Sequence, residues 1–382
     1  MSKAPALLLV ANYPSNVGYA WWLMEEFWCA LAATAKTQGW RTILVFPELT
    51  EVSERLRNAP IQLLQLDAKA ALGAERGALS ALILRENVRA AYLTDWPYRS
   101  LLYARMRWWG VKTLIMHDHM PGERPPIPPV RRLIKRGVHA LPYITCDLYI
   151  GVSEFIYHRF INRVCLPPSK CTFVRNGIAP IAADARDRQY LRREFGIPTD
   201  SIVVVTTGRA TEYKRIGLVV RAASRVSQAR PGQSIHFVHC GDGPLLPQLK
   251  RLIADLAMTR RFILAGCRED VRLLLTSADI AVHASKGEAF SLSILEYMSA
   301  GLATIVPDNS GNREAVTDGE SGLVVADGDE TALADALLQL IDKPELRRRL
   351  SQAARRRVAA EFTLERAKGE LTAIITRYLD RC

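Results

Sequence analysis

Short apolar runs alternate with segments of helical periodicity along the chain. In the first half, buried strands are predicted at 6–11, 42–46, 61–66, 90–94, 113–116, 147–152 and 172–175. Helices are predicted between them at 18–36, 75–87, 100–109, 130–140 and 154–162. Repeated βα units of this kind build a parallel sheet with helices on both faces, and its ligands gather at the carboxyl ends of the strands.

The same alternation resumes after a break. Gly177 to about Asp187 is rich in small residues and proline, and we interpret it as an interdomain linker. Strands are predicted beyond it at 202–207, 235–240, 261–265, 279–284 and 303–306, followed by a helical tail at 330–378. A length of 382 residues is too great for one ordinary core. We therefore predict an N-terminal α/β domain at 1–178, a second at 179–360, and a C-terminal helix at 361–382 that could return to the first.

Two carboxylates flank a predicted helix start in Gly287–Gly301, which reads GEAFSLSILEYMSAG. Glu288 lies in the turn after a strand, and Glu296 lies inside a helix that begins near Ser291. The first amides of such a helix point outward and can hold a phosphate. Carboxylates repel phosphates, so their expected targets are sugar or ribose hydroxyls. The alternative is structural: Ser293 to Glu296 fits a capping box, and Glu288 is then an ordinary loop acid.

Two cations follow the strand 202–207, in the sequence GRATEYKR. Arg209 and Lys214 lie just past a strand end, where they can neutralise a diphosphate and stabilise the charge that grows on it as a bond to it breaks. A single surface Arg or Lys is otherwise expected to be solvated.

The segment Ser285–Val325 resembles the donor-site signature of glycosyltransferase family 4, whose members are retaining enzymes with the GT-B fold. The resemblance rests on the E-x7-E pair, Ala300-Gly301 and the later GNREAVTDGESGLVV, with Ser291 where Gly is common and Tyr297 where Ala is common. It implies two Rossmann-like domains whose parallel sheets face a deep interdomain cleft. The C-terminal domain would bind a nucleotide diphosphate sugar, and the N-terminal domain would bind the acceptor.

The resemblance also assigns roles to individual residues. Glu288 would contact the transferred sugar and Glu296 the ribose, while Arg209 and Lys214 would bind the diphosphate. Four further donor-binding positions are implied, three by their amides and one by a close backbone approach: Phe290, Ser291, Leu292 and Gly241. On this basis we expect catalysis to involve His117, Glu288, Arg209 and Lys214.

The resemblance implies fewer residues for the acceptor site than for the donor site. His117 follows the strand 113–116 and matches the position where the family often has a histidine that reaches the reacting sugar, although His119 competes for that role. In the loop NYPSNVGY only Gly18 remains of the paired glycines that the family usually has there, and Tyr19 follows it. Both are candidate acceptor-binding residues. Ser153, after another strand, is expected to cap a helix.

The resulting expectation is a metal-independent retaining glycosyltransferase of the hexosyltransferase class. Its donor would be a UDP-sugar or GDP-sugar, with no cofactor, and its product a bacterial cell-surface polysaccharide or lipid-linked glycan. The alternatives are transfer to a soluble small molecule, a nucleotide-sugar epimerase, a non-catalytic binding protein and a nucleic-acid binder, although no motif of the last is present. Asp327 and Asp329 superficially match a D-x-D metal site but suit a helix cap, so no metal site is expected.

Charge and hydropathy bear on location. The net charge is +12, and the stretch from Arg99 to Tyr143 holds nine Lys or Arg against two acids, which favours an anionic partner. The helix 130–141 has an apolar face and a basic face, so it suits an anionic membrane surface, unless it docks on its own sheet. No apolar run reaches the ~18 residues of a membrane span, and seven scattered cysteines show no C-x-x-C spacing. We expect a cytoplasmic protein, peripheral at the inner membrane face if this helix binds lipid, with free thiols.

Overall fold

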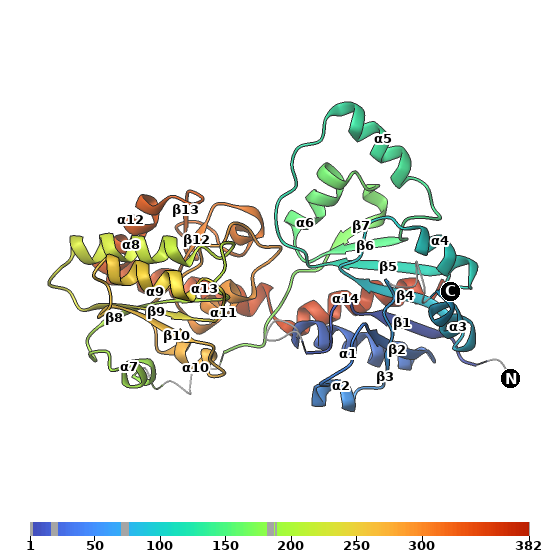
Figure 1. Cartoon of the computed structure of the whole chain (residues 1–382), viewed down its shortest axis with the longest axis horizontal. Coiled ribbons are helices and arrows are strands. Elements are labelled where there is room, and N and C mark those ends of the chain that lie inside the picture. The colour runs from blue at the N-terminus through green and yellow to red at the C-terminus, as the bar shows by residue number, and fades with distance from the viewer. Residues whose placement is uncertain (1–2, 17–21, 70–75, 182–186, 188, 382) are drawn as a thin grey trace. The chain divides into compact units, whose positions relative to one another are not determined.

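The computed structural model describes residues 3–16, 22–69, 76–181, 187 and 189–381, which form two compact units (Figure 1). Unit 1 comprises Met1–Arg175 and Glu365–Cys382, and unit 2 comprises Asn176–Leu364. The boundaries predicted from sequence, after residues 178 and 360, lie close to these divisions. The last helix, α14 (Leu364–Leu379), lies in unit 1 apart from its first residue, and Lys368 on it pairs with Glu26 at 3.4 Å.

Unit 1 is built on a parallel sheet of seven strands in the order β3-β2-β1-β4-β5-β6-β7. The strands are β1 (Ala6–Val10), β2 (Arg41–Phe46), β3 (Gln62–Gln65), β4 (Val88–Thr94), β5 (Thr113–Asp118), β6 (Leu148–Gly151) and β7 (Cys171–Phe173). The helices are α1 (Trp22–Thr37), α2 (Glu54–Asn58), α3 (Arg76–Arg85), α4 (Leu101–Trp108), α5 (Pro129–His139) and α6 (Glu154–Arg159), with a π-helix at Phe160–Val164 and a 3-10 turn at Pro168–Lys170.

The central strands of unit 1 are apolar on both faces because helices cover both. All five residues of β1 are buried. Phe27 and Trp28 on α1 are also buried, and Trp28 meets Phe46 edge to face at 5.6 Å between ring centroids. These two aromatic residues of α1 therefore belong to the core of unit 1.

Unit 2 has a six-stranded parallel sheet in the order β10-β9-β8-β11-β12-β13. The strands are β8 (Ile202–Thr207), β9 (Ile235–Cys240), β10 (Phe262–Gly266), β11 (Ile280–Val282), β12 (Ala303–Pro307) and β13 (Leu323–Val325). The helices are α7 (Tyr190–Phe195), α8 (Ile216–Ala229), α9 (Leu246–Asp255), α10 (Val271–Thr276), α11 (Leu292–Ala300), α12 (Glu330–Asp342) and α13 (Pro344–Glu361), with a 3-10 turn at Ser310–Ala315.

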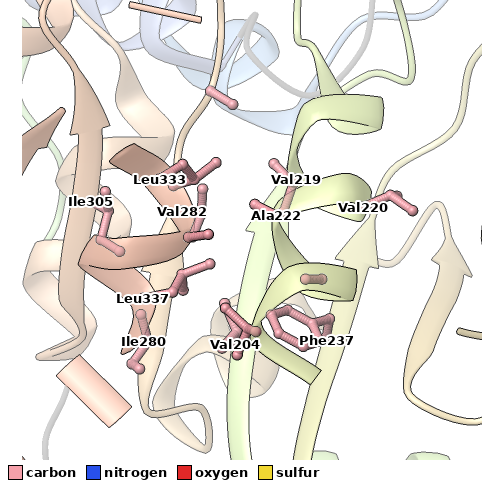
Figure 2. Close-up of a cluster of buried hydrophobic side chains, with 14 of the residues drawn as sticks. Val204, Val219, Val220, Ala222, Phe237, Ile280, Val282, Ile305, Leu333 and Leu337 are labelled. Carbon is pink, nitrogen blue, oxygen red and sulfur yellow. The ribbon is translucent and has the colours of Figure 1, made fainter. Parts of the chain in front are cut away.

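Alternation along β8 separates the core of unit 2 into layers. Val204 joins Val219 of α8 and Leu337 of α12 in one buried cluster (Figure 2). Its neighbour Val205 packs on the other face with Tyr297 of α11. Side chains of adjacent strand residues point to opposite faces, so this single strand anchors helices on both sides of the sheet.

Candidate functional site in unit 2 and the carboxyl edge of unit 1

The strand order of unit 2 places two loops side by side. Strand β8 has β9 and β10 on one side and β11 to β13 on the other, so the chain reverses direction of winding between β8 and β11. The loop after β8 holds Arg209 and Lys214, and the loop after β11 holds Glu288. A crevice at such a switch point is the usual ligand site of an open α/β sheet.

An ion pair crosses this switch point. Lys214 Nζ lies 2.5 Å from Glu288 Oε1, and the two side chains are only 23% and 15% exposed. His283 Nε2 lies 3.5 Å from the same oxygen. Burial raises the pKa of Glu288, but the bond from His283 and the charge of Lys214 outweigh it and lower that pKa to about 2. The structure therefore joins two of the residues predicted from sequence and keeps Glu288 ionised.

His283 belongs to a polar cluster that sequence reasoning missed. The histidine is buried, which lowers its pKa, and its Nε2 lies 2.8 Å from Ser285 Oγ. Asn312 Nδ2 donates to the same hydroxyl at 3.2 Å, and Asn309 Nδ2 donates to Ser285 O at 3.0 Å. These bonds fix the loop that carries Glu288. The signal available in the sequence was the density of polar residues immediately after two adjacent strands.

The start of α11 has no side-chain cap. Ser291 is the residue before the first helical turn, and its side chain makes no capping bond. Ser293 lies inside the helix, so the capping-box alternative for Ser293 and Glu296 is wrong. Glu296 is buried at 3% exposure on α11. The first amides of the helix have no partners within the helix, so the Phe290–Leu292 turn suits the predicted phosphate contact.

Two other predicted donor residues have different surroundings. The Arg209 side chain is exposed to solvent. Gly241 has φ +154°, and a Cβ there would overlap the Gly208 carbonyl. The close approach of the two backbones therefore requires glycine at position 241 without any reference to a ligand.

The D-x-D pair is occupied by structural contacts. Arg215 Nη1 lies 2.5 Å from Asp327 Oδ1. Asp329 caps α12, and its side chain accepts the amide of Ala332 at 3.0 Å. The interpretation of Asp329 as a helix cap is confirmed.

A separate cavity of 590 Å³ lies at the opposite edge of the unit 2 sheet. It is lined by Asp279, which precedes β11, by Gly301, which precedes β12, and by Arg347 and Arg355 of α13. None of the predicted donor-binding residues lines it. Ligands of parallel sheets bind at the carboxyl ends, so we place the candidate site at the switch point rather than in this cavity.

In unit 1, the predicted loop position of His117 is wrong. Strand β5 continues through Asp118, so His117 lies within the strand and is fully buried. The Tyr92 hydroxyl is hydrogen-bonded to its Nδ1, and burial holds its pKa well below the usual value. His119 is in the following turn with its ring centroid 4.2 Å away, and burial lowers its pKa to about 3. Both rings are therefore neutral near pH 7.

Asp118, one residue beyond His117, explains why the strand extends. It is fully buried, and Arg159 Nη2 pairs with its Oδ2 at 3.0 Å. The Tyr98 hydroxyl donates to the same oxygen at 2.5 Å. Arg159 also donates to the carbonyl of Gly122 at 2.7 Å. These partners, which come from distant parts of unit 1, make a buried polar strand end stable.

The remaining acceptor-side predictions have separate outcomes. Gly18 and Tyr19 lie outside the described residues. Ser153 caps α6, because its side chain accepts the amide of Ile156 at 3.2 Å. The prediction of a cap at Ser153 is confirmed.

Asp95 marks the switch point of unit 1. It follows β4, and the side-chain amide of Asn12, from the loop after β1, donates to its carbonyl at 2.9 Å. Its Oδ1 accepts the backbone amide of His119 at 2.6 Å. Burial first, and the nearby Asp118 charge second, raise the pKa of Asp95 to about 7.

The titration of Asp95 predicts a pH dependence of stability. The folded state keeps this proton up to about pH 7, whereas the unfolded chain releases it near pH 4, so the folded state binds more protons in this window. Its contribution to stability therefore falls as pH rises, by at most about 1.4 kcal/mol per pH unit. Urea unfolding from pH 5 to 8 should show a smaller loss in Asp95→Asn than in the unaltered protein. Both proteins contain the same histidines, so histidine titration contributes equally to both stability curves and drops out of their difference. An Asp95→Asn curve parallel to that of the control Glu51→Gln would contradict the assignment.

Comparison with known proteins bears on unit 2 first. Residues 187–357 match the family model for glycosyl transferases group 1. EpsD of Bacillus subtilis is 30% identical over 243 residues, covering 62% of each chain. The amylovoran biosynthesis glycosyltransferase AmsK of Erwinia amylovora is 28% identical over 239 residues, which cover 60% of this chain and 56% of AmsK. The match thus spans less than two thirds of the length of either relative.

The comparison of structures covers the whole chain. HepE of Anabaena, in complex with UDP-glucose, aligns over 98% of this chain and 100% of its own with a TM-score of 0.74 and 17% identity. The two parallel-sheet units with this likeness establish the GT-B fold, as the sequence predicts.

Proposed function

We propose that this protein is a retaining glycosyltransferase of family 4 that transfers a sugar from a nucleotide diphosphate sugar to an acceptor hydroxyl. The observation that carries the proposal is the Lys214–Glu288 pair at the switch point of unit 2, beside the uncapped start of α11. UDP-glucose bound to HepE and the family match of residues 187–357 support a nucleotide-sugar donor of the UDP or GDP type.

Each donor-site residue has a role in this proposal. Lys214 and Arg209 neutralise the diphosphate and stabilise the charge that develops on it as the sugar leaves. The Phe290–Leu292 amides bind the same group through the helix start. Glu296 accepts a ribose hydroxyl and Glu288 a sugar hydroxyl, while Gly241 lets the backbone pass near the nucleotide. Cationic side chains and amides then do the work of charge neutralisation without a metal ion or cofactor.

The acceptor side of the proposal concerns unit 1. His117, which is fully buried, would act on the acceptor side as a positioning residue through the adjacent ring of His119, and Gly18 and Tyr19 would contribute to the acceptor surface. The similarity to AmsK, an amylovoran biosynthesis glycosyltransferase, supports assembly of a cell-surface polysaccharide or lipid-linked glycan.

The direct test is turnover of a panel of UDP-, GDP- and ADP-sugars with lipid-linked and soluble sugar acceptors. We expect nucleotide diphosphate to be released only when an acceptor is present, and NMR to show the donor's anomeric configuration in the product. Acceptor-independent conversion to an isomerised nucleotide sugar would instead identify an epimerase and contradict the proposal.

We also propose that α5 binds an anionic membrane surface. The prediction that this helix could dock on its own sheet is wrong: Val130, Leu133, Ile134 and Leu141 are 73%, 74%, 61% and 52% exposed. Figure 1 shows α5 at the margin of unit 1. Exposed apolar side chains beside basic ones are the pattern of a helix that lies in a membrane interface. Among the described residues, no helix combines the length and hydropathy that crossing a bilayer requires.

Leu133→Gln should weaken vesicle binding. Loss of one inserted leucine is expected to lower partitioning into phosphatidylglycerol vesicles about ten-fold. Leu84→Gln is the matched control, because Leu84 is similarly exposed, at 65%, on α3 of the same unit. Co-sedimentation should show retained binding for the control and little binding of any variant to neutral phosphatidylcholine. Equal binding of the two variants to anionic vesicles would show that α5 is not the contact.

A further inference from the structure

Five cationic side chains surround a cavity at the carboxyl edge of the unit 1 sheet. The cavity has a volume of 480 Å³, and Asp95 and Trp96 beyond β4 and Met120 beyond β5 form part of its lining. The cations come from several elements and are Lys69, Arg99, Arg124, Lys135 and Arg163. A volume of this size suits a small-molecule ligand.

The five cations are not engaged in ion pairs with the described residues. None of them forms a salt bridge with a residue that the structure describes. Asp95 is the only acid among the described lining residues, and because its pKa is raised to about 7 it is largely uncharged below that pH. Like charges gathered around one concave site repel each other, and a bound anion would relieve that repulsion.

Two details indicate a site that is organised in advance. Arg124 stacks over the Tyr98 ring at 5.1 Å and lies 3.5 Å from its hydroxyl, which restricts the guanidinium. Trp96 is 3% exposed, and its indole N–H finds no acceptor among the described residues. The indole nitrogen itself is shielded from solvent, so Trp96 contributes a buried apolar wall to the cavity rather than a hydrogen-bond donor.

A second cavity extends the basic surface. It has a volume of 410 Å³ and shares Arg124 and Arg163 with the first, adding Arg132 from α5 and the acid Glu123. Guanidinium groups bind phosphate oxygens in pairs, and lysines bind them as point charges. Two adjoining basic cavities with shared arginines fit two linked phosphates better than one carboxylate.

We propose that the cavity lined by Lys69, Arg99, Arg124, Lys135 and Arg163 binds a phosphate or pyrophosphate group carried by the acceptor. As an acceptor site it rests on the proposed transferase function, but the anion site itself does not. The shared chemistry is a phosphoryl group, whose source is either the headgroup of a polyprenyl diphosphate or a soluble sugar phosphate.

The test measures protection of Lys135 at the site itself. The full-length protein is acetylated with and without inorganic pyrophosphate at constant ionic strength, and peptide mass spectrometry follows the modification rates of Lys135 and of the exposed Lys112. We expect pyrophosphate to slow acetylation of Lys135 at least about five-fold and to leave Lys112 unchanged. Because the readout is residue-specific, pyrophosphate bound in unit 2 does not interfere.

Two double variants with the same change in charge distinguish binding in this cavity from a general effect of positive surface charge. Arg124→Gln/Arg163→Gln should abolish the protection of Lys135. Arg131→Gln/Arg136→Gln, which removes the same charge from exposed positions on α5 that do not line the cavity, should retain it. No protection in folded unaltered protein, or equal protection in both double variants, would overturn the proposal.

Two further measurements identify the source of the phosphoryl group and distinguish failure of the anion site from failure of the proposed transferase function. Farnesyl diphosphate protecting Lys135 at lower concentration than pyrophosphate identifies a lipid headgroup, whereas stronger protection by glucose 1-phosphate identifies a sugar phosphate. Nucleotide binding is measured on the same samples. Lys135 protection without nucleotide binding leaves the anion site standing and removes the transferase function, and the reverse result removes only the anion site.

Discussion

Lys214→Ala is expected to reduce kcat/KM for sugar transfer about 100- to 1,000-fold, the usual cost of removing one group that stabilises charge in the transition state. Lys214 forms a largely buried ion pair with Glu288. In the proposed mechanism it binds the diphosphate, on which negative charge develops as the sugar leaves. Steady-state kinetics with the identified donor measure the effect. Thermal unfolding of the same sample separates lost chemistry from lost folding.

Variants of the partner residue Glu288 and of a control lysine test the same assignment. Glu288→Gln preserves the shape of the side chain but removes its charge, and we expect a loss of similar order with a largely unchanged melting temperature. The two residues act together, so the double variant should be much less impaired than the product of the two single effects. Lys250→Ala, on the exposed side of α9, should transfer at the normal rate. Unchanged rates in both Lys214→Ala and Glu288→Gln would refute the assignment of this pair.

Arg159→Met is expected to destabilise unit 1 by about 3–5 kcal/mol, because it leaves the buried carboxylate of Asp118 without its ion-pair partner. The pair is almost fully enclosed, with side-chain exposures of 2% and 0%. Urea unfolding measures the free energy of unfolding. Adding Asp118→Asn to Arg159→Met should recover part of the loss, since it removes the unpaired charge.

Arg131→Met is the control for this second prediction, because Arg131 is exposed on α5 and should change stability by less than about 0.5 kcal/mol. A loss below about 1 kcal/mol in Arg159→Met would mean that the buried pair does not hold the carboxyl end of β5 in place.

The sequence predicts the sheets well because their strands are continuous apolar runs. Strands 202–207 and 235–240 match β8 and β9 at both ends. The end of β5 was missed for a physical reason. The polar run His117-Asp118-His119 resembles a loop. Contacts of Asp118 with Arg159 and Tyr98, far away in sequence, and pairing with β6 stabilise the first two of these residues in the strand.

Helix α5 shows the same limit in another form. Its spacing of apolar and basic residues predicts an amphipathic helix, and the structure has one at Pro129–His139. What covers the apolar face depends on tertiary packing, which spacing does not encode. Docking on the sheet was a sound expectation, but Leu133 and Ile134 are exposed.

The candidate donor site was also predictable from the sequence only in part. The motif predicted that Glu288 and Lys214 matter, since each follows a strand end. Their direct contact could not be predicted, because it depends on β8 and β11 being neighbours in the sheet. The supporting cluster of His283, Ser285 and Asn312 also depends on that topology, which brings together residues from two loops.

The measurement that tests the central claim most directly is thermal stabilisation by UDP, GDP and ADP, each alone and as sugar conjugates, without added metal. Binding to the folded state raises the melting temperature by mass action. We expect one base to stabilise the unaltered protein clearly and Lys214→Ala to lose most of that shift while Lys250→Ala keeps it. No response of the folded protein to any nucleotide, or an equal response in Lys214→Ala, would contradict a nucleotide-sugar site at the switch point of unit 2.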